Sequence, residues 1–417
     1  MNPFTHMRPV VSALRGHRAS VLLLVLEIAL TLAVLCNLMF IITGTFQRTA
    51  QPTGITEMDV GLIQSIGVIG ADNPGTAGSS LAALQSVPGV EAAAFGVVPL
   101  WGVPRMPVFL SADAKQPQAR PYQFVGSQGL NRVLGVQVLE GRDILEEEIP
   151  TPQQIFGESG GGAAAAPPAQ MPALLTQSLA SHLFPGESAL GKTLHTDVFG
   201  NAVALRVVGV IAPLRAAITG HADDDQAVLI QFKLSSEGLG GGYLIRSKPG
   251  QLQQVLPLAA KAMQQANPGH VQQEVKSVAE LRTDYFRSER ATARMLLAIV
   301  AILLAITALG VTGLASFWVQ QRTKQIGIRR ALGATRRDIL RYFQLENFLI
   351  VGAGVLLGTL LAFALNQWLM RRFELDHLDS PMVITGAIAV WLLGQLAVLG
   401  PALRAAAVPP IVATRSA

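Results

Sequence analysis

Four apolar segments, each long enough to cross a lipid bilayer, constrain this sequence more than any other feature. They are residues 20–42, 295–319, 348–369 and 382–403. A membrane-spanning helix needs about 20 predominantly apolar residues, and only helices or closed barrels satisfy their backbone polar groups inside a bilayer. Because hydrophobic residues make up 50% of the chain, helices buried in a water-soluble core are a poor alternative. The sequence therefore predicts an α-helical membrane protein with four transmembrane helices.

The basic residues predict how these helices are oriented. Arg8, Arg15 and Arg18 lie before the first apolar segment without any acid, and the second and third segments are joined by a short basic loop. Short loops rich in Lys and Arg stay on the cytoplasmic side. We therefore expect a cytoplasmic amino-terminal segment, a cytoplasmic loop, a short outer loop and a cytoplasmic tail, at residues 1–19, 320–347, 370–381 and 404–417. Residues 43–294 then form a large domain outside the cytoplasm.

The first apolar segment is interpreted as a retained membrane anchor. Its length of about 22 residues exceeds the apolar region of roughly 7 to 15 residues that signal peptides contain. The single cysteine, Cys36, lies within this segment, so a hydrophobic core rather than a disulfide is expected to hold the outer domain. The net charge of +5 is explained largely by the inner loops, and gives no reason to expect nucleic acid as a partner.

The outer region reads as a large α/β (α+β) domain of two subdomains between transmembrane helices 1 and 2. A strand, helix, strand order at its start returns at its end, in the segments 60–69, 80–85 and 90–100, and then 242–246, 252–266 and 271–278. We expect these two βαβ-like halves to form one subdomain, with residues from about 105 to 235 inserted as the other. Residues 150–171, rich in Gly, Ala, Pro and Gln, are expected to form a flexible insert.

The basic loop is patterned as well as charged. From Arg322 to Arg341 it contains seven basic residues and one acid. Ile326, Arg329, Arg330 and Leu332 have helical spacing, and Gly333 is suited to end that helix in a left-handed cap. Thr335 with Asp338 resembles a capping box that starts another helix. The pattern predicts a short amphipathic docking helix directly before a membrane span.

The segment Lys324-Gln-Ile-Gly-Ile-Arg-Arg-Ala-Leu-Gly-Ala334 resembles the coupling-helix segment of FtsX/MacB-type ABC transporter permeases. Segments 124–143 and 175–192 resemble the MacB-like periplasmic core domain, and the similarity of order, one span before this domain and three after it, covers most of the chain. Gln325 stands where the family usually has a Glu. The resemblance implies that the ATPase-coupling residues are Gln325, Ile326, Gly327, Ile328, Arg329, Arg330, Ala331, Leu332, Gly333 and Ala334.

The same resemblance implies a permease subunit in the bacterial inner membrane, with its large domain in the periplasm. The chain lacks an ATPase of its own, so it is expected to be non-catalytic, without a cofactor or metal, while a separate cytoplasmic ABC ATPase binds ATP and Mg²⁺. ATP binding and hydrolysis would move the periplasmic domain, a coupling called mechanotransmission, for efflux or envelope export. Further implied partners are a second permease, identical or not, membrane lipids, a periplasmic adaptor and an outer-membrane channel.

Three other functions remain open at this stage. One is an FtsX-like regulator that transmits the state of the ATPase to a periplasmic hydrolase. The second is a permease that extracts lipoproteins, and the third is a membrane enzyme with an external catalytic domain. No local set of Ser, His and Asp, no Cys and His pair and no carboxylate pair supports the enzyme.

Four remaining patterns are interpreted structurally. Residues 186–193 satisfy the phosphate-loop pattern, but a helix-like run precedes them and a strand-like run follows, which predicts a turn. Residues 221–225, His-Ala-Asp-Asp-Asp, are interpreted as a solvated acidic loop rather than a metal site. Glu27, the only charge inside the first span, is expected to reach the membrane surface or pair with the basic loop, with a functional role as the alternative. Gly354 and Gly358 are expected to serve helix packing.

Overall fold

The computed structural model describes residues 18–67, 76–97, 103–151, 154, 170–198, 201–216, 223–233, 242–373 and 380–407. Two compact units are present, one from Met1–Gln47 with Ser288–Ala417 and the other from Arg48–Arg287. Residues 1–17, most of the predicted insert, half of the predicted loop at 370–381, and the tail beyond residue 407 lie outside the described residues.

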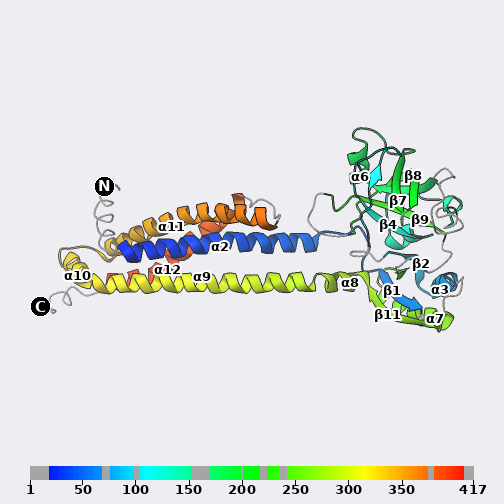
Figure 1. Ribbon diagram of the computed structural model, residues 1–417. Coiled ribbons are helices and arrows are strands. Elements are labelled where there is room, and N and C mark those ends of the chain that lie inside the picture. Colours follow the sequence, from blue (N-terminus) through cyan, green and yellow to red (C-terminus); the bar gives the residue numbers. More distant parts are fainter. Residues whose placement is uncertain are drawn as a thin grey trace. The chain divides into compact units, whose positions relative to one another are not determined.

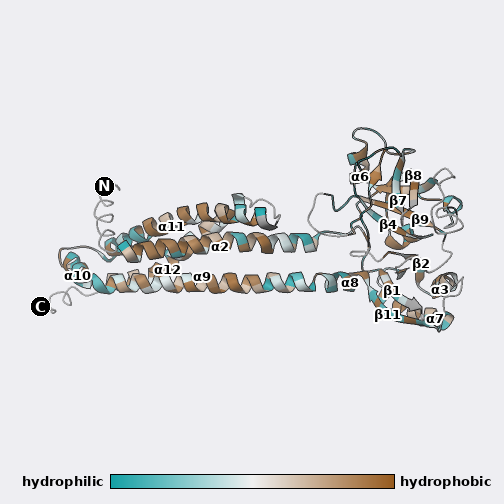
Figure 2. Cartoon of the chain, in the orientation of Figure 1, coloured by the Kyte–Doolittle hydropathy of each residue, from teal (hydrophilic) through white to brown (hydrophobic). Residues whose placement is uncertain are grey.

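Long apolar helices form the first unit (Figures 1 and 2). Among the described residues, four helices are long and apolar enough to cross a membrane, which confirms the predicted architecture. They are α2 (Arg18–Ala50), α9 (Arg287–Gln321), α11 (Arg336–Phe373) and α12 (Ser380–Ala407). A shorter helix, α10 (Thr323–Ala331), lies between α9 and α11 in the chain.

These helices extend beyond their apolar segments. Helix α9 has 35 residues and is therefore about 50 Å long at 1.5 Å per residue. The hydrocarbon core of a bilayer is only about 30 Å thick. The first turns of α9 contain the charged residues Glu289 and Arg290. These turns stay helical because intrahelical hydrogen bonds satisfy the backbone in water as well as in lipid. An apolar segment thus predicts the part of a helix that lies in the bilayer, and not where the helix begins or ends.

Small and polar side chains hold the helices together. The Thr31 and Thr307 hydroxyls, from α2 and α9, lie 2.8 Å apart. The amide of Asn347 in α11 donates to the carbonyl of Gly394 in α12 at 2.9 Å. All four long helices also contribute side chains to one hydrophobic core. Interhelical hydrogen bonds of this kind typically add about 0.6 kcal/mol each within a membrane.

Gly354 and Gly358 pack α11 against α2. A Cβ atom added to Gly354 would lie 2.8 Å from Ile28 Cβ, and one added to Gly358 would lie 2.9 Å from the Ala29 carbonyl oxygen. Because only glycine lets the two backbones approach this closely, both residues act in packing within the chain, as expected.

In the described part of the second unit, 11 strands form one sheet. Its strand order is β11-β1-β10-β2-β4-β9-β6-β8-β7-β3, with β5 paired to β8. The strands are β1 (Val60–Gly67), β2 (Val90–Gly96), β3 (Val108–Phe109), β4 (Tyr122–Ser127), β5 (Val138–Gly141), β6 (Gln170–Thr176), β7 (Thr193–Val198), β8 (Asn201–Ile211), β9 (Ala227–Phe232), β10 (Gly242–Ser247) and β11 (His270–Ser277).

The first subdomain interleaves the two ends of this unit. Helix α3 (Thr76–Gln85) connects β1 to β2, and α7 (Leu252–Ala266) connects β10 to β11. Strand β1 pairs antiparallel with both β10 and β11, and β10 pairs antiparallel with β2. Successive strand residues face opposite sides, so Ile63 joins the core under α3 and α7 while Leu62 joins the core on the other face. The two predicted βαβ-like halves are therefore confirmed.

The remaining strands form the inserted second subdomain, together with α4 (Leu130–Leu134), the 3₁₀ helix η3 (Glu146–Glu148) and α6 (Gln177–Leu183). Its sheet joins that of the first subdomain through a single register pair of β2 and β4, Gly96 with Gly126. A Cβ atom on Gly126 would lie 2.6 Å from the Phe95 carbonyl oxygen, so this junction requires glycine. One hydrophobic core extends across it, from Leu62 in β1 to Leu229 in β9.

The end of the last predicted strand needs a correction. Strand β11 ends at Ser277, and Val278 begins a helix that the sequence analysis did not predict, α8 (Val278–Tyr285). Ser277 caps this helix, because its hydroxyl accepts from the Glu280 N–H while the Glu280 carboxylate accepts from the Ser277 N–H. This capping box overrides the strand preference of Val278.

Candidate functional site

Helix α10 and its two ends form the candidate site predicted from the basic loop. After α10, Gly333 has φ +100°, its N–H donates to the Arg330 carbonyl, and the Ala334 N–H donates to the Arg329 carbonyl. This is the Schellman pattern of a glycine-ended helix. Helix α11 then starts with the expected capping box, because Thr335 Oγ1 accepts from the Asp338 N–H and the Asp338 carboxylate accepts from the Thr335 N–H. The end of α10 and the start of α11 are thus fixed by residues within one turn of each.

One face of α10 is buried against the helical unit. Ile326 is only 4% exposed and belongs to the same core as Ile339 and Phe343 of α11. A small cavity of about 20 Å³ remains between the two helices, lined by Ile326 and by Arg322, among others. Ile326 and Gly327 therefore position α10 rather than present it to a partner.

Two arginines of α10 also contact the helical unit. Arg330 Nη1 donates to the carbonyl oxygen of Ala406, near the end of α12, at 2.7 Å. The Arg329 guanidinium carbon lies 4.9 Å from the centre of the Tyr342 ring in α11, a cation–π arrangement worth about 0.5 to 1 kcal/mol where it is exposed. These contacts hold α10 to α11 and α12, so its exposed face has a fixed position.

The opposite face presents uncharged side chains within a basic surround. Leu332 is 83% exposed and Ile328 is 50% exposed, and Gln325 is exposed as well. Lys324, Arg336 and Arg337 are exposed nearby in sequence. A leucine this exposed at the end of a rigid basic helix offers an apolar contact for another protein.

Of the ten predicted coupling residues, two are buried, Ile326 and Gly327, and two are half-buried, Arg330 and Ala334. The other six are exposed: Gln325, Ile328, Arg329, Ala331, Leu332 and Gly333. Their contact with an ATPase stays a prediction. Sequence reasoning missed the ion pair between Arg322 and Glu346, which joins the residue before α10 to α11. A usable signal existed, because Glu346 is an isolated acid directly before an apolar segment, and such charges are usually paired.

The phosphate-loop-like segment 186–193 is a turn. Helix α6 comes before it and strand β7 after it, the opposite of the strand, loop, helix order that holds phosphates at a helix amino terminus. Lys192 Nζ is 2.9 Å from Glu187 Oε2 and lies over the Phe184 ring. This interpretation agrees with the sequence analysis.

The acidic segment ending at Asp225 differs from the expectation of a solvated loop. Asp223 Oδ2 lies 2.6 Å from Arg105 Nη1, and Asp224 is buried and lies 3.7 Å from the same guanidinium. Asp223 and Asp224 are therefore interpreted as ion-pair partners of Arg105, because a buried carboxylate needs a charged or hydrogen-bonding partner. His221 lies outside the described residues. Among the described residues, no group of three or more His, Cys, Asp or Glu side chains could hold a metal ion.

Glu27 lies against α9. Gly310 leaves space for its carboxylate, since a Cβ atom there would come within 2.8 Å of Glu27 Oε2. The expected pairing with the basic loop is not found in the part of the chain that the structure describes.

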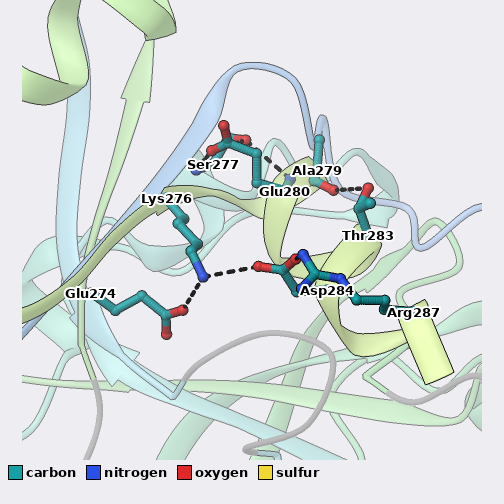
Figure 3. A network of polar contacts seen from close by, with 8 residues as sticks. All are labelled: Glu274, Lys276, Ser277, Ala279, Glu280, Thr283, Asp284 and Arg287. Atoms are coloured by element: carbon teal, nitrogen blue, oxygen red, sulfur yellow. Dashed lines mark hydrogen bonds and ion pairs between the residues drawn. The ribbon is translucent and has the colours of Figure 1, made fainter.

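A polar network holds α8 to β11 at the end of the second unit (Figure 3). Lys276 Nζ lies 2.8 Å from Glu274 Oε1 and 2.8 Å from Asp284 Oδ2, and Asp284 also contacts Arg287. The hydrogen bond from Lys276 holds the pKa of the Asp284 carboxyl below its usual value. The same bond, with that to Glu274, raises the pKa of Lys276.

Two family models match the chain. The MacB-like periplasmic core domain matches residues 22–278, and the FtsX-like permease C-terminal domain matches residues 297–410. Together they cover α10 and most of the outer domain and of the four apolar helices, and residues 279–296 lie between the two matches.

Curated relatives include the pyoverdine export ATP-binding/permease protein PvdT of Pseudomonas putida, 28% identical over 240 residues. Macrolide export ATP-binding/permease proteins MacB of Wolinella succinogenes and Rhodospirillum rubrum are 26% and 30% identical over 259 and 256 residues. These matches cover 56%, 58% and 58% of this chain, but only 36%, 38% and 37% of the relatives. The chain thus matches well under half the length of these proteins.

Among solved structures, the periplasmic region of MacB from Actinobacillus actinomycetemcomitans aligns with a TM-score of 0.34 and 11% identity, covering 57% of this chain and 97% of that one. The extracellular domain of YknZ from Gram-positive bacteria aligns with a TM-score of 0.32 and 14% identity, covering 52% and 100%.

Proposed function

The chain belongs to the MacB-like family of ABC transporter permeases, and on that premise we propose that it couples a separate cytoplasmic ATPase to movement of its outer domain. The observation that carries the proposal is the exposed apolar face of α10, with Leu332 at its end. The ATPase would bind ATP and Mg²⁺, and this chain would supply no catalytic group. A second permease would complete the assembly, and the work would be efflux or envelope export.

The anchoring of α10 supports this role. A helix held loosely would yield when a partner pushes on it, whereas α10 is tied to α11 and α12 through Glu346, Tyr342 and the Ala406 carbonyl. A displacement of α10 is therefore passed on to two long helices. Outside, the network of Lys276, Asp284 and Arg287 links β11 and α8 to the first residue of α9 (Figure 3).

The docking step is tested by Leu332→Asp. A carboxylate in the apolar contact must be desolvated without a partner, which costs a few kcal/mol and weakens binding by more than tenfold. The variant should remain at normal abundance in native membranes but lose the copurifying ATPase. Arg329→Glu should act in the same direction, because it reverses a charge beside the contact.

Leu258→Asp is the matched control, since Leu258 is an exposed leucine of α7 in the other unit. It should leave ATPase recovery unchanged. Full recovery of the ATPase with both Leu332→Asp and Arg329→Glu would exclude α10 as the docking site. Mass spectrometry of the wild-type complex identifies the outer partner, an adaptor for efflux or a hydrolase for regulation.

The proposed orientation places both chain ends and α10 in the cytoplasm and the sheet domain in the periplasm. A membrane-impermeant thiol reagent added to spheroplasts should label Ser111→Cys, on the outer domain, and spare Arg337→Cys, beside α10. Both positions are exposed. Labelling of Arg337→Cys with protection of Ser111→Cys would show the opposite orientation, in which α10 could not contact a cytoplasmic ATPase.

A further inference from the structure

A polar cleft of about 650 Å³ lies between the two subdomains of the outer domain. One side is formed by α3 and β2 of the first subdomain. The other side is formed by α4, η3 and the ends of β4 and β9 of the second subdomain. Pockets of 300 to 1,000 Å³ are typical of small-molecule sites.

The cleft occupies a position in the sheet where ligand sites are common. Strands β4 and β9 run parallel, and both reach the cleft near their carboxyl ends, β4 through Ser127 and β9 through Gln231 and the following Lys233. On its other side β4 meets β2, which runs antiparallel. In α/β sheets, ligands bind outside the carboxyl ends of parallel strands where the strand order changes.

A chain of buried polar groups lies along the cleft. The Gly129 N–H donates to Gln231 Oε1 at 3.2 Å, and Gln231 Nε2 donates to Asn131 Oδ1 at 2.8 Å. Asn131 Nδ2 in turn donates to the Asp143 carboxylate. Because an ionised carboxylate only accepts, this order fixes which way both amides point. Gln231 and Asn131 are only 2% and 7% exposed, but both line the cleft, and each uses one of its two amide N–H groups in this chain of hydrogen bonds.

The charged groups of the cleft are of both signs. Arg132 and Lys233 supply cations and Glu146 an anion, and none of the three has an ion pair among the described residues. By contrast, Glu91 in the same cleft lies 3.8 Å from Arg246 Nε. The cleft therefore offers free charges of both signs beside oriented amides.

We propose that this cleft binds short peptides. A peptide presents amide groups that match Asn131 and Gln231, a free carboxylate for Arg132 and Lys233, and an ammonium group for Glu146. An occupant would touch both subdomains across the single β2–β4 register pair. Binding would then restrain the angle between the subdomains, which links this site to the movement of the outer domain.

The test uses the full chain in detergent micelles without any ATPase, so its failure would leave the proposed docking of α10 untouched. A mixture of tripeptides with free carboxyl ends is incubated with the protein, and a second mixture has the same sequences as carboxyl-terminal amides. Retained peptides are measured by mass spectrometry after rapid gel filtration. The variants are Arg132→Ala, Lys233→Ala and the double change. Lys192→Ala is the control, an exposed lysine of the same subdomain outside the cleft.

The wild type and Lys192→Ala should retain a subset of the free-acid tripeptides, and the double variant should bind them at least tenfold more weakly. The matching amides should bind the wild type more weakly by a similar factor, because they lack the carboxylate. All three changed side chains are exposed, and circular dichroism checks that the variants stay folded. Absence of retained peptide with the wild type, or equal retention by the double variant, would overturn the proposal.

Discussion

Arg322 Nη1 lies 2.9 Å and 2.8 Å from the two carboxylate oxygens of Glu346. The side chains of the pair are only 11% and 3% exposed. The arginine directly precedes α10 and the glutamate lies within α11, 24 residues later. This ion pair ties the start of α10 to α11.

Removing one partner should be far more harmful than removing both. Glu346→Gln or Arg322→Gln alone leaves a buried charge unpaired, and such changes cost about 3 to 5 kcal/mol. The double change should recover a large part of this loss. Unfolding free energies of the four proteins in mixed micelles give the coupling energy. Arg336→Gln, at an exposed position, should change little, and additive effects of the two single changes would show that the pair is not coupled.

Two glycines of α11 should respond oppositely to alanine. At Gly358 the added methyl meets the backbone of Ala29 at 2.9 Å and 3.0 Å, whereas at Gly352 nothing lies within 4 Å. Gly358→Ala should therefore lower the unfolding free energy by about 1 to 3 kcal/mol through overpacking. Gly352→Ala should be neutral or stabilising by up to about 1 kcal/mol, because alanine favours helices. Equal effects in the same micelle assay would refute close packing of α2 on α11.

Lys192→Ala should leave ATP hydrolysis by the assembled complex unchanged. Lys192 belongs to a turn and pairs with an exposed glutamate, an interaction worth about 0 to 1 kcal/mol. A true phosphate-loop lysine contacts the β and γ phosphates, and its loss would nearly abolish turnover. The rate is compared with wild type at matched ATPase content. Micromolar nucleotide binding by the isolated permease that Lys192→Ala removes would contradict the turn interpretation.

The network in Figure 3 should contribute to stability in a pH-dependent way. The Asp284 pKa is lowered from 3.8, chiefly by Lys276. A carboxyl with a depressed pKa stabilises the fold above its unfolded pKa, and this contribution is lost as pH falls through the folded value. The contribution should thus be complete above about pH 4 to 5 and disappear in stronger acid. In Lys276→Met the Asp284 pKa should rise toward 3.8, as measured by carboxyl NMR titration. Gln253→Met, at an exposed position of α7 that is not part of the network, serves as the control. An unchanged Asp284 pKa in Lys276→Met would show that Lys276 is not the cause of the lowered value.

Local patterns were sufficient for much of this protein. Apolar runs identified the four long helices, because the bilayer demands a minimum apolar length whatever the partners of each helix. The order of strand, helix and strand appeared twice, and helix α7 follows the predicted 252–266 without a shift. Gly333 identified the end of α10, and Thr335 with Asp338 identified the start of α11, since caps depend on residues within one turn. The prediction that Val278 belongs to a strand was wrong, because the capping box of Ser277 and Glu280 starts a helix at this residue.

The sequence by itself determined that α10 is a short basic helix before a span, but not which of its sides is buried. Ile326 and Ile328 are equally apolar in sequence, and only packing against Ile339 and Phe343 buries the first and leaves the second exposed. Likewise, only the tertiary structure assigned Glu346 to Arg322, placed Gly358 against Ala29, and brought Asn131, Asp143 and Gln231 into one cleft. Each of these results depends on contacts between residues far apart in the chain, and spacing within a helix or strand carries no information about them.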